Sequence, residues 1–482
     1  MKAKILSAIS LLLMLCILVA CAPSNLPDAE TNLGDTPEDS FGECGLPNIE
    51  SAVINGKELS EFTIVYSGSE DDYNKRAAEY IQKMIKEKAN LDLPIVTDTT
   101  SQAKYEIVVG ETSRDISKQL DANTTGVQFA ILADDDQIAL EGDHFVIAAA
   151  AYYFIETYIT SDKFYANVPT TASICEPIVK EAKNYFFLIG DGMGTYQTKL
   201  FDYMTIPTEN NYSDNEDIFY GYMFPYQGLA KTNSLSGVTD SAAGGTALAT
   251  GYRTLNEYVG INRAKENVQS LTELASSLGM STAVVSTDAA TGATPSAFTA
   301  HVEDRDLTVE ITKQQIAFRK EHGTIITGGL NNYEPVKVKE LEKAITTYVD
   351  KLDDNEKGFF MMYEEGHIDK HSHNNDMENT FLAVIRFNQI IATVMEYAFY
   401  NPETFVIITA DHETGDLRPD SSGNLKYNSG KHSGANVPVF AYGKDAACFD
   451  GKTVINAQIP KTIAKLWGVA DFGDSKIVGP LN

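Results

Sequence analysis

The chain has 482 residues, of which 43% are hydrophobic and 22% are charged, so it is long enough for two or more domains with buried cores. This composition excludes a small disulfide-rich scaffold, a coiled coil and a mostly disordered chain. The 38 basic and 67 acidic residues give a formal net charge of −29, which excludes a nucleic-acid-binding surface that works by neutralising phosphates.

The first twenty residues have the features of a signal peptide. Lys2 and Lys4 precede an apolar run over residues 5–20, which is too short for a spanning helix but typical of a secretory signal. The run ends in LVAC, which resembles the lipobox of bacterial lipoproteins. The resemblance implies a lipid on Cys21, a membrane anchor through that lipid and an extracytoplasmic location, at the cell surface or on the periplasmic face. A plain cleaved signal peptide is the alternative.

Residues 21–49 are predicted to form a lipid-anchored acidic linker, because residues 22–49 are rich in Pro, Asn, Ser, Thr and acids and lack apolar periodicity. Apart from Cys16 in the signal and Cys21, the cysteines are Cys44, Cys175 and Cys448. Three cysteines cannot all pair, so the sequence does not indicate a disulfide framework. One bridge with one free thiol remains open.

Residues 50–178 are predicted to form a small α+β domain, because short apolar runs alternate with helical stretches. We expect strands at 62–66, 107–110, 128–133 and 137–141, and helices at 73–89 and 144–159. The segments around EIVVGETSRD and DDDQIALEGDHFVIAAAAYYFIETYI resemble the accessory domain found at the amino end of bacterial carbohydrate-active enzymes. Contact with a glycan and a packing role are both open, and no site is assigned.

Residues 183–482 are predicted to form an α/β domain with a doubly wound, mostly parallel sheet flanked by helices. Short apolar strands are expected at 185–189, 282–286, 358–362, 405–409 and 437–441, separated by long helix-forming segments. Because ligands bind beyond the carboxyl ends of the strands in such sheets, the functional residues are expected among those that follow the strands.

Metal-ligand residue types follow three of these strands and precede a fourth. The candidates are Asp191 in GDGMG, Glu364, Glu365, His367, Asp369, His371 and His373 in YEEGHIDKHSH, Asp411 and His412 in ADHETGD, and His432 in KHSG. Six of the eight histidines, including His301, lie in or near these segments. Carboxylate and imidazole ligands without thiolates favour catalytic Zn²⁺, with Mg²⁺ at an all-oxygen position.

Two local patterns refine this set. Asp369 and His373 are four residues apart, so one helical turn brings both side chains to the same face. Asp240 and Ser241 precede a run of small residues, so Ser241 should lie at or near a helix amino terminus, where backbone N–H groups favour an anion. Read alone, Ser241 is most simply a helix N-cap. As a nucleophile it would need no histidine base if a bound cation lowered the pKa of its oxygen.

The segment 183–482 resembles the alkaline phosphatase family. The motifs that carry the resemblance occur in order and are FFLIGDGMG, VTDSAA, GATPSAFTAHVEDR, EEGHIDKHSH, TADHETGD and KHSG. The resemblance implies hydrolysis of phosphate monoesters through a covalent phosphoserine at Ser241. It implies two zinc ions, one on Asp369, His373 and His432 and one on Asp191, Asp411 and His412. It also implies that Arg305 clamps the phosphate and that Lys370 lies near it.

The resemblance implies a third, magnesium site on Asp191, Thr294 and Glu364, and here the sequence departs from the family. The family usually has Asp or His two residues before the threonine, where this chain has Gly292. Water, the nearby Asp288 or nothing could replace the missing ligand, so magnesium binding is an open expectation. The spacing to Asp369 favours Glu364 over Glu365 as the ligand.

Two other functions stay open. One is a hydrolase of the same superfamily that acts on phosphodiesters, phosphonates or sulfate esters. The other is an inactive, glycan-binding surface lipoprotein. A homodimer is a further expectation that the sequence does not decide.

Overall fold

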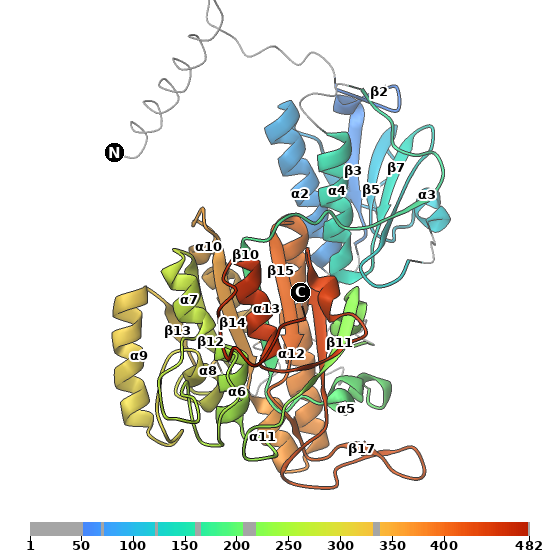
Figure 1. Ribbon diagram of the computed structural model, residues 1–482. Helices are drawn as coiled ribbons and strands as arrows, with labels where there is room; N and C mark the ends of the chain where they lie inside the picture. Colours follow the sequence, from blue (N-terminus) through green and yellow to red (C-terminus); the bar gives the residue numbers. More distant parts are fainter. Residues whose placement is uncertain are drawn as a thin grey trace, which may run out of the picture. The chain divides into compact units, whose positions relative to one another are not determined.

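The computed structural model describes residues 52–68, 72–120, 124–159, 165–205, 218–330 and 338–480. The predicted signal peptide, the linker, Cys21 and Cys44 lie outside the described residues. The chain from Glu50 to Asn482 forms one compact unit, which contains a smaller and a larger sheet (Figure 1). The division into domains at 178–183 stays a prediction.

The amino-terminal region has the predicted α+β character. Its six-stranded sheet has the order β4-β3-β5-β7-β6-β9, with β4, β3, β5 and β7 parallel. Helices α2 and α4 pack against each other. The bounds are β3 (Phe62–Tyr66), α2 (Asp72–Ala89), β4 (Ile95–Thr97), β5 (Tyr105–Val109), α3 (Asp115–Gln119), β6 (Phe129–Ala133), β7 (Gln137–Glu141), α4 (Ile147–Tyr158) and β9 (Ser173–Cys175), with a small sheet of β1 (Val53–Ile54), β2 (Lys57–Glu58) and β8 (Tyr165–Ala166).

The larger sheet has eight strands in the order β13-β12-β14-β10-β15-β20-β11-β21. The five strands from β13 to β15 are parallel, and β20 runs antiparallel to β15 and β11. The bounds are β10 (Asn184–Gly190), β11 (Tyr226–Lys231), β12 (Ser281–Ser286), β13 (Ile325–Thr327), β14 (Phe359–Glu365), β15 (Thr404–Thr409), β20 (Val437–Tyr442) and β21 (Thr453–Ile455). The predicted mostly parallel α/β sheet is confirmed, and β11, β13 and β21 are strands that the sequence analysis did not predict.

Two groups of helices pack against this sheet. Helix α6 contacts α7, α8 and α13, whereas α10 contacts α12. Strand β10 is buried along its whole length, as expected for a strand covered on both faces. The bounds are α5 (Thr195–Thr198), α6 (Ser241–Thr250), α7 (Leu271–Ser277), α8 (Ala293–Ala297), α9 (Thr308–His322), α10 (Val338–Leu352), α11 (His367–His373), α12 (Met377–Tyr400) and α13 (Gln458–Leu466).

Helix α12 is the one helix among the described residues that is long and apolar enough to cross a membrane. Within its most apolar window, 78% of the residues are buried inside the protein. It contacts β10, β15, α10 and α11. These contacts identify α12 as a core helix of the larger region.

The cysteines of the described region do not form a bridge. Cys175 and Cys448 are both free thiols. The bridge that the cysteine count left open therefore does not join these two residues.

Candidate active site

The candidate ligands gather at the carboxyl edge of the parallel strands. Asp191 directly follows β10, Glu364 lies at the end of β14, and Asp411 comes two residues after β15. These three strands are neighbours in the sheet, so their carboxyl ends bring carboxylates together that are up to 220 positions apart in sequence. These candidate residues therefore lie at or beyond the strand ends, as expected.

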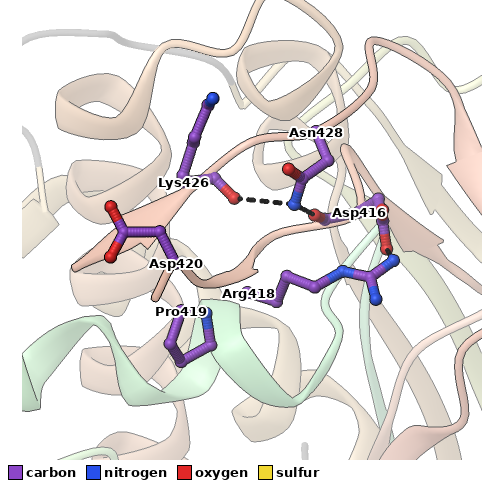
Figure 2. Close-up of a pocket in the computed structure, with 6 residues that line it drawn as sticks. All are labelled: Asp416, Arg418, Pro419, Asp420, Lys426 and Asn428. Atoms are coloured by element: carbon purple, nitrogen blue, oxygen red, sulfur yellow. Dashed lines mark hydrogen bonds and ion pairs between the residues drawn. The ribbon is translucent and has the colours of Figure 1, made fainter. Parts of the chain in front are cut away.

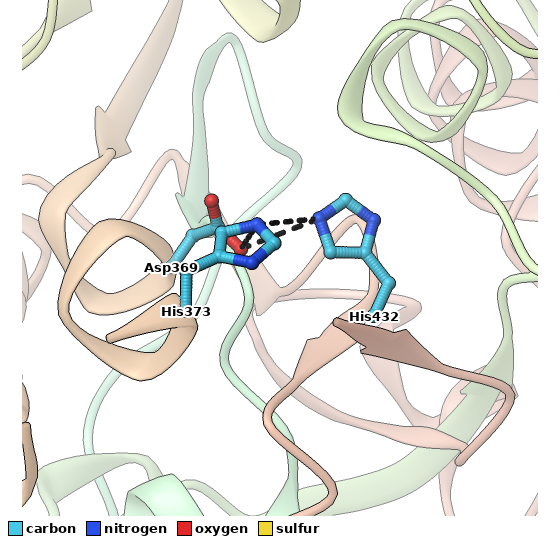
Figure 3. A group of neighbouring side chains, drawn as sticks. All are labelled: Asp369, His373 and His432. Atoms are coloured by element: carbon cyan, nitrogen blue, oxygen red, sulfur yellow. Dashed lines mark hydrogen bonds and ion pairs between the residues drawn. The ribbon is translucent and has the colours of Figure 1, made fainter. Parts of the chain in front are cut away.

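One group of side chains consists of Asp369, His373 and His432 (Figure 3). Asp369 and His373 lie on α11, and Asp369 Oδ1 is 3.4 Å from His373 Nε2. His432 comes from β19 (His432–Ser433), and its Nε2 is 3.5 Å from the same carboxylate oxygen. The two Nε2 atoms are 3.0 Å apart. Three donor atoms therefore converge on one point, as a metal site requires.

A second group consists of Asp191, Asp369 and His412. His412 Nε2 lies 3.5 Å from Asp191 Oδ1 and 3.1 Å from Asp411 Oδ2. Asp369 thus belongs to both groups, whereas the family resemblance implies a place in the first alone. The two candidate sites share one carboxylate.

The imidazoles of His373 and His432 are oriented by hydrogen bonds at Nδ1, which leave their Nε2 atoms facing the ligand group. His373 Nδ1 donates to the carbonyl of Gly430 (2.9 Å), and His432 Nδ1 donates to that of Thr239 (2.8 Å). A carbonyl can only accept, so in both rings Nδ1 carries a proton. The hydrogen bond to Asp369 raises the pKa of His373 to about 9. Burial lowers the pKa of His412 well below its ordinary value.

The donor set fits a bound cation. Asp191 Oδ1 and Asp411 Oδ2 are buried and have no hydrogen-bond partner among the described residues. Buried carboxylate oxygens are normally paired or coordinate metal. The two facing Nε2 atoms of His373 and His432 likewise need a proton or a cation between them. Two candidate metal sites with nitrogen and oxygen donors follow.

The pKa values of the buried carboxylates are shifted because these side chains lie close together. Burial and three neighbouring carboxylates, that of Asp411 first, raise the pKa of Asp191 well above its ordinary value. Burial and the charge of Asp369 do the same for Asp411. Burial raises the pKa of Glu364 to about 7. Burial opposes ionisation of Asp369 too, but the hydrogen bond and charge of His373 and its neighbouring imidazoles hold its pKa well below the ordinary range.

Metal binding should therefore stabilise the protein more at alkaline than at acid pH. Without metal, Asp191, Asp411 and Glu364 retain protons that the unfolded chain releases near the ordinary pKa values of 3.8 and 4.5. Because the folded state binds more protons, the stability of the metal-free protein falls as pH rises, for Glu364 through about 7. We expect the gain in melting temperature on adding zinc to be larger at about pH 8 than at about pH 5. Equal gains at both pH values would contradict this account.

Ser241 lies beside the second group. It is the first residue of α6, is 4% exposed, and its Oγ is 3.1 Å from His412 Nε2. The expected position at a helix amino terminus is confirmed, but the reading of Ser241 as the N-cap is wrong. Asp240 is the N-cap, and its side chain accepts from the backbone N–H of Ala243 at 2.9 Å. The cap therefore leaves the Ser241 hydroxyl available for chemistry.

Two positively charged side chains lie near the metal-ligand groups. The side chain of Arg305 is 32% exposed, and its Nη1 is 3.7 Å from Oδ2 of Asp240, the residue before Ser241. Lys370 follows Asp369 on α11 and forms an ion pair with Asp288. Both side chains are thus held by a carboxylate at the edge of the site.

Two of the residues expected for a third site, Asp191 and Glu364, are near enough for the charge of Glu364 to raise the pKa of Asp191. Glu364 accepts a hydrogen bond from Ser286 Oγ at the end of β12. Thr294 lies on α8, which contacts the helix that begins at Ser241. A Cβ atom on Gly292 would lie 3.2 Å from Asp288 Oδ2, so the Asp288 carboxylate occupies the space beside that glycine.

The structure explains why Glu364, and not Glu365, faces the site. The Glu365 carboxylate accepts from Arg386 Nε of α12 (2.7 Å) and from Thr287 Oγ1 (3.1 Å). Although burial opposes it, the charge of Arg386 lowers the pKa of Glu365 to about 2. The buried ion pair therefore withdraws Glu365 from the metal-ligand groups.

Three of the six clustered histidines belong to neither group. His301 Nδ1 donates to the carbonyl of Gly260 (2.6 Å), and its Nε2 contacts Glu273 (3.2 Å). His367 Nδ1 is 3.2 Å from Thr287 Oγ1. His371 shares α11 with the ligand residues but is outside both groups. The histidines that do belong to the groups, His373, His412 and His432, are those that the family resemblance implies as ligands.

A hairpin lies between His412 and His432 in the chain. Strands β17 (Arg418–Pro419) and β18 (Leu425–Lys426) form it, and a hollow of about 310 Å³ lies on it (Figure 2). The lining residues are Asp416, Arg418, Pro419, Asp420, Lys426 and Asn428. None of them belongs to the ligand groups, so this hollow is not where the ligands converge.

Comparison with known proteins identifies the family of this chain. The sequence model of the family described as alkaline phosphatase matches residues 182–339 and 331–424, just over half of the chain. The chain belongs to the alkaline phosphatase family. The match begins directly before β10 and includes every candidate residue of the site except His432.

Curated relatives in this family are distant. The chain is 29% identical to alkaline phosphatase 4 of Bacillus subtilis over 304 residues, which cover 52% of this chain and 65% of the relative. It is 24% identical to the alkaline phosphatase of Escherichia coli over 57% of this chain and 84% of the relative. The chain thus spans less than two thirds of the length of the Bacillus relative.

Solved structures agree in fold. The alkaline phosphatase of the Antarctic bacterium TAB5 superposes with a TM-score of 0.53 at 26% identity, over 61% of this chain and 100% of the other. A variant of that enzyme has magnesium bound in a site named M3. The Shewanella cold-active enzyme, at 22% identity and a TM-score of 0.51, supports the fold.

Proposed function

We propose that the protein hydrolyses phosphate monoesters to an alcohol and inorganic phosphate through a covalent phosphoserine at Ser241. The observation that carries this proposal is the buried Ser241 hydroxyl, 3.1 Å from His412 Nε2 within a group of metal-ligand side chains. A hydroxyl at a helix amino terminus among cation ligands suits attack on a phosphoryl group.

Two zinc ions are the cofactors that the donor set favours. Asp369, His373 and His432 would hold one ion, and Asp191, Asp411 and His412 would hold the other, with Asp369 between them. Zinc bound there would lower the pKa of the Ser241 hydroxyl and of water and would offset charge on the phosphoryl oxygens. Magnesium on Asp191, Thr294 and Glu364 is the third-site proposal, supported by the magnesium in the M3 site of the TAB5 variant.

The chain's own residues account for positioning. Ser241 Oγ attacks phosphorus and the substrate alcohol leaves; water then attacks the phosphoserine and releases phosphate. Arg305, whose planar fork suits two phosphate oxygens, binds the equatorial oxygens, and Lys370 adds positive charge near them. Local cations allow an anionic substrate despite the overall charge of −29.

The protein's surroundings are also proposals. A lipid on Cys21 would hold an extracytoplasmic enzyme at the membrane, and residues 21–49 would act as spacer. Residues 50–178 would form an accessory domain that contacts a glycan. The protein would form a homodimer. No described side chain is assigned to any of these roles.

Substrate class is tested by comparing a nitrophenyl monoester with the bis-nitrophenyl diester on the full chain loaded with zinc and magnesium. We expect kcat/KM for the monoester to exceed that for the diester by at least about 100-fold, since Arg305 and Lys370 match the two charges of a monoester. A preference for the diester, or for a nitrophenyl sulfate, would assign the protein to another activity of the superfamily. If the metal-loaded protein hydrolysed none of these substrates, the result would favour an inactive, glycan-binding surface lipoprotein.

A further inference from the structure

Thr414 lies at the junction of the two metal-ligand groups. It ends β16 (Glu413–Thr414), is fully buried, and pairs in register with His432 of β19. Its backbone N–H donates to the carbonyl of Gly192 (3.1 Å), next to Asp191. One residue is thus fixed against strands and loops that supply ligands to both groups.

The Thr414 hydroxyl contacts one carboxylate ligand and one imidazole ligand. It donates to Asp369 Oδ1, the carboxylate that both groups share, and it lies 3.2 Å from His412 Nδ1. A hydroxyl has one proton, and an ionised carboxylate can only accept. Because the proton is used toward Asp369, the contact with His412 requires the hydroxyl to accept, and His412 Nδ1 must carry the hydrogen.

This arrangement decides which nitrogen of His412 faces the site. With the hydrogen on Nδ1, the lone pair lies on Nε2. That atom is 3.1 Å from Ser241 Oγ and 3.1 Å from Asp411 Oδ2. His373 and His432 obtain the same tautomer from backbone carbonyls, whereas His412 depends on one side chain.

We propose that Thr414 is a positioning residue of the metal centre, whose hydroxyl joins Asp369 to His412 and holds both in the form that binds cations. The inference rests on the proposed function, because it takes the two groups to be zinc sites. Thr414 touches no reacting atom; it acts through the ligands on either side of it.

The test is zinc affinity, measured on the full chain by competition with a chromophoric chelator. Thr414→Val keeps the shape of the side chain and removes the hydroxyl, and we expect zinc affinity to fall by about 10-fold to 100-fold, as for other partners of metal ligands. Thr414→Ser keeps the hydroxyl, and we expect its affinity to stay within about threefold of the original chain. The kcat of Thr414→Val should fall in parallel at subsaturating zinc.

Thr404→Val is the matched control. Thr404 is also fully buried, and its hydroxyl donates to the carbonyl of Asn401 (2.7 Å) at the other end of β15, away from the ligands. The inference is overturned if Thr414→Val and Thr404→Val bind zinc equally well. If Thr414→Val does not fold, Thr414→Ala replaces it as the hydroxyl-free variant. Failure of the original chain to bind zinc would instead overturn the proposed function.

Discussion

Replacement of Ser241 by alanine is expected to abolish hydrolysis while leaving the metal centre loaded. The hydroxyl is the proposed attacking atom, and Ser241 belongs to neither ligand group. Loss of a nucleophile typically costs several orders of magnitude, so we expect kcat to fall by at least about 10³-fold. Bound zinc, measured by mass spectrometry, should remain as in the original chain.

Ser277→Ala is a suitable control for this experiment. Ser277 is the last residue of α7, and its hydroxyl donates only locally, to the carbonyl of Leu274 (2.7 Å). Its removal should leave kcat within about twofold, because no ligand or substrate contact is lost. A Ser241→Ala variant that retained most of the activity would show that another group attacks phosphorus.

Replacement of Asp369 by asparagine is expected to empty both zinc sites. Asp369 Oδ1 is within 3.5 Å of His373 and His432, and the same side chain belongs to the group of Asp191 and His412. Asparagine keeps the size but removes the charge that both cations would share. We expect zinc affinity to fall by at least about 100-fold, more than for a partner that only orients a ligand, and activity to be lost with it.

The readouts for Asp369→Asn are zinc content and the change in melting temperature on adding zinc. A ligand stabilises the folded state only as far as it binds, so zinc at about 100 times the original dissociation constant should no longer raise the melting temperature fully. Asp354→Asn, an exposed carboxylate before β14, is the matched control and should behave like the original chain. Loss of only one of two zinc ions would show that the two sites do not depend on a shared carboxylate.

Much of the site could be predicted because its signals are local or follow from topology. Asp191 and Asp411 follow short apolar runs that favour buried strands, and the carboxyl ends of parallel strands share an edge. The four-residue spacing of Asp369 and His373 predicts one helix face, and the observed distance of 3.4 Å confirms it. The small residues after Asp240 likewise predicted the helix that begins at Ser241.

The remaining features depend on contacts between distant segments. No pattern shows that Asp369 belongs to both groups, because that position depends on how α11 packs against β16 and against Gly192 in the loop after β10. Arg386, which pairs with Glu365, lies in an apolar helix and follows its partner by 21 residues. Thr414 was overlooked because a threonine two residues after a histidine carries no chemical signal by itself.

The nearby histidines that lie outside the ligand groups do so for a physical reason. His301 and His367 are satisfied by carbonyl, carboxylate and hydroxyl partners away from the ligand groups. A sequence shows that histidines are close to a site but not which ring nitrogen finds a competing partner. The tautomer and direction of each ring depend on tertiary contacts.

The most direct test of the account is the mass of the chain after acid quenching during hydrolysis of a phosphate monoester, followed by mapping of the peptide that contains Ser241. The account predicts one added phosphoryl group on that serine, and none in Ser241→Ala under the same conditions. An active, metal-loaded protein with no adduct, or with the adduct on another residue, would contradict a phosphoserine mechanism at Ser241.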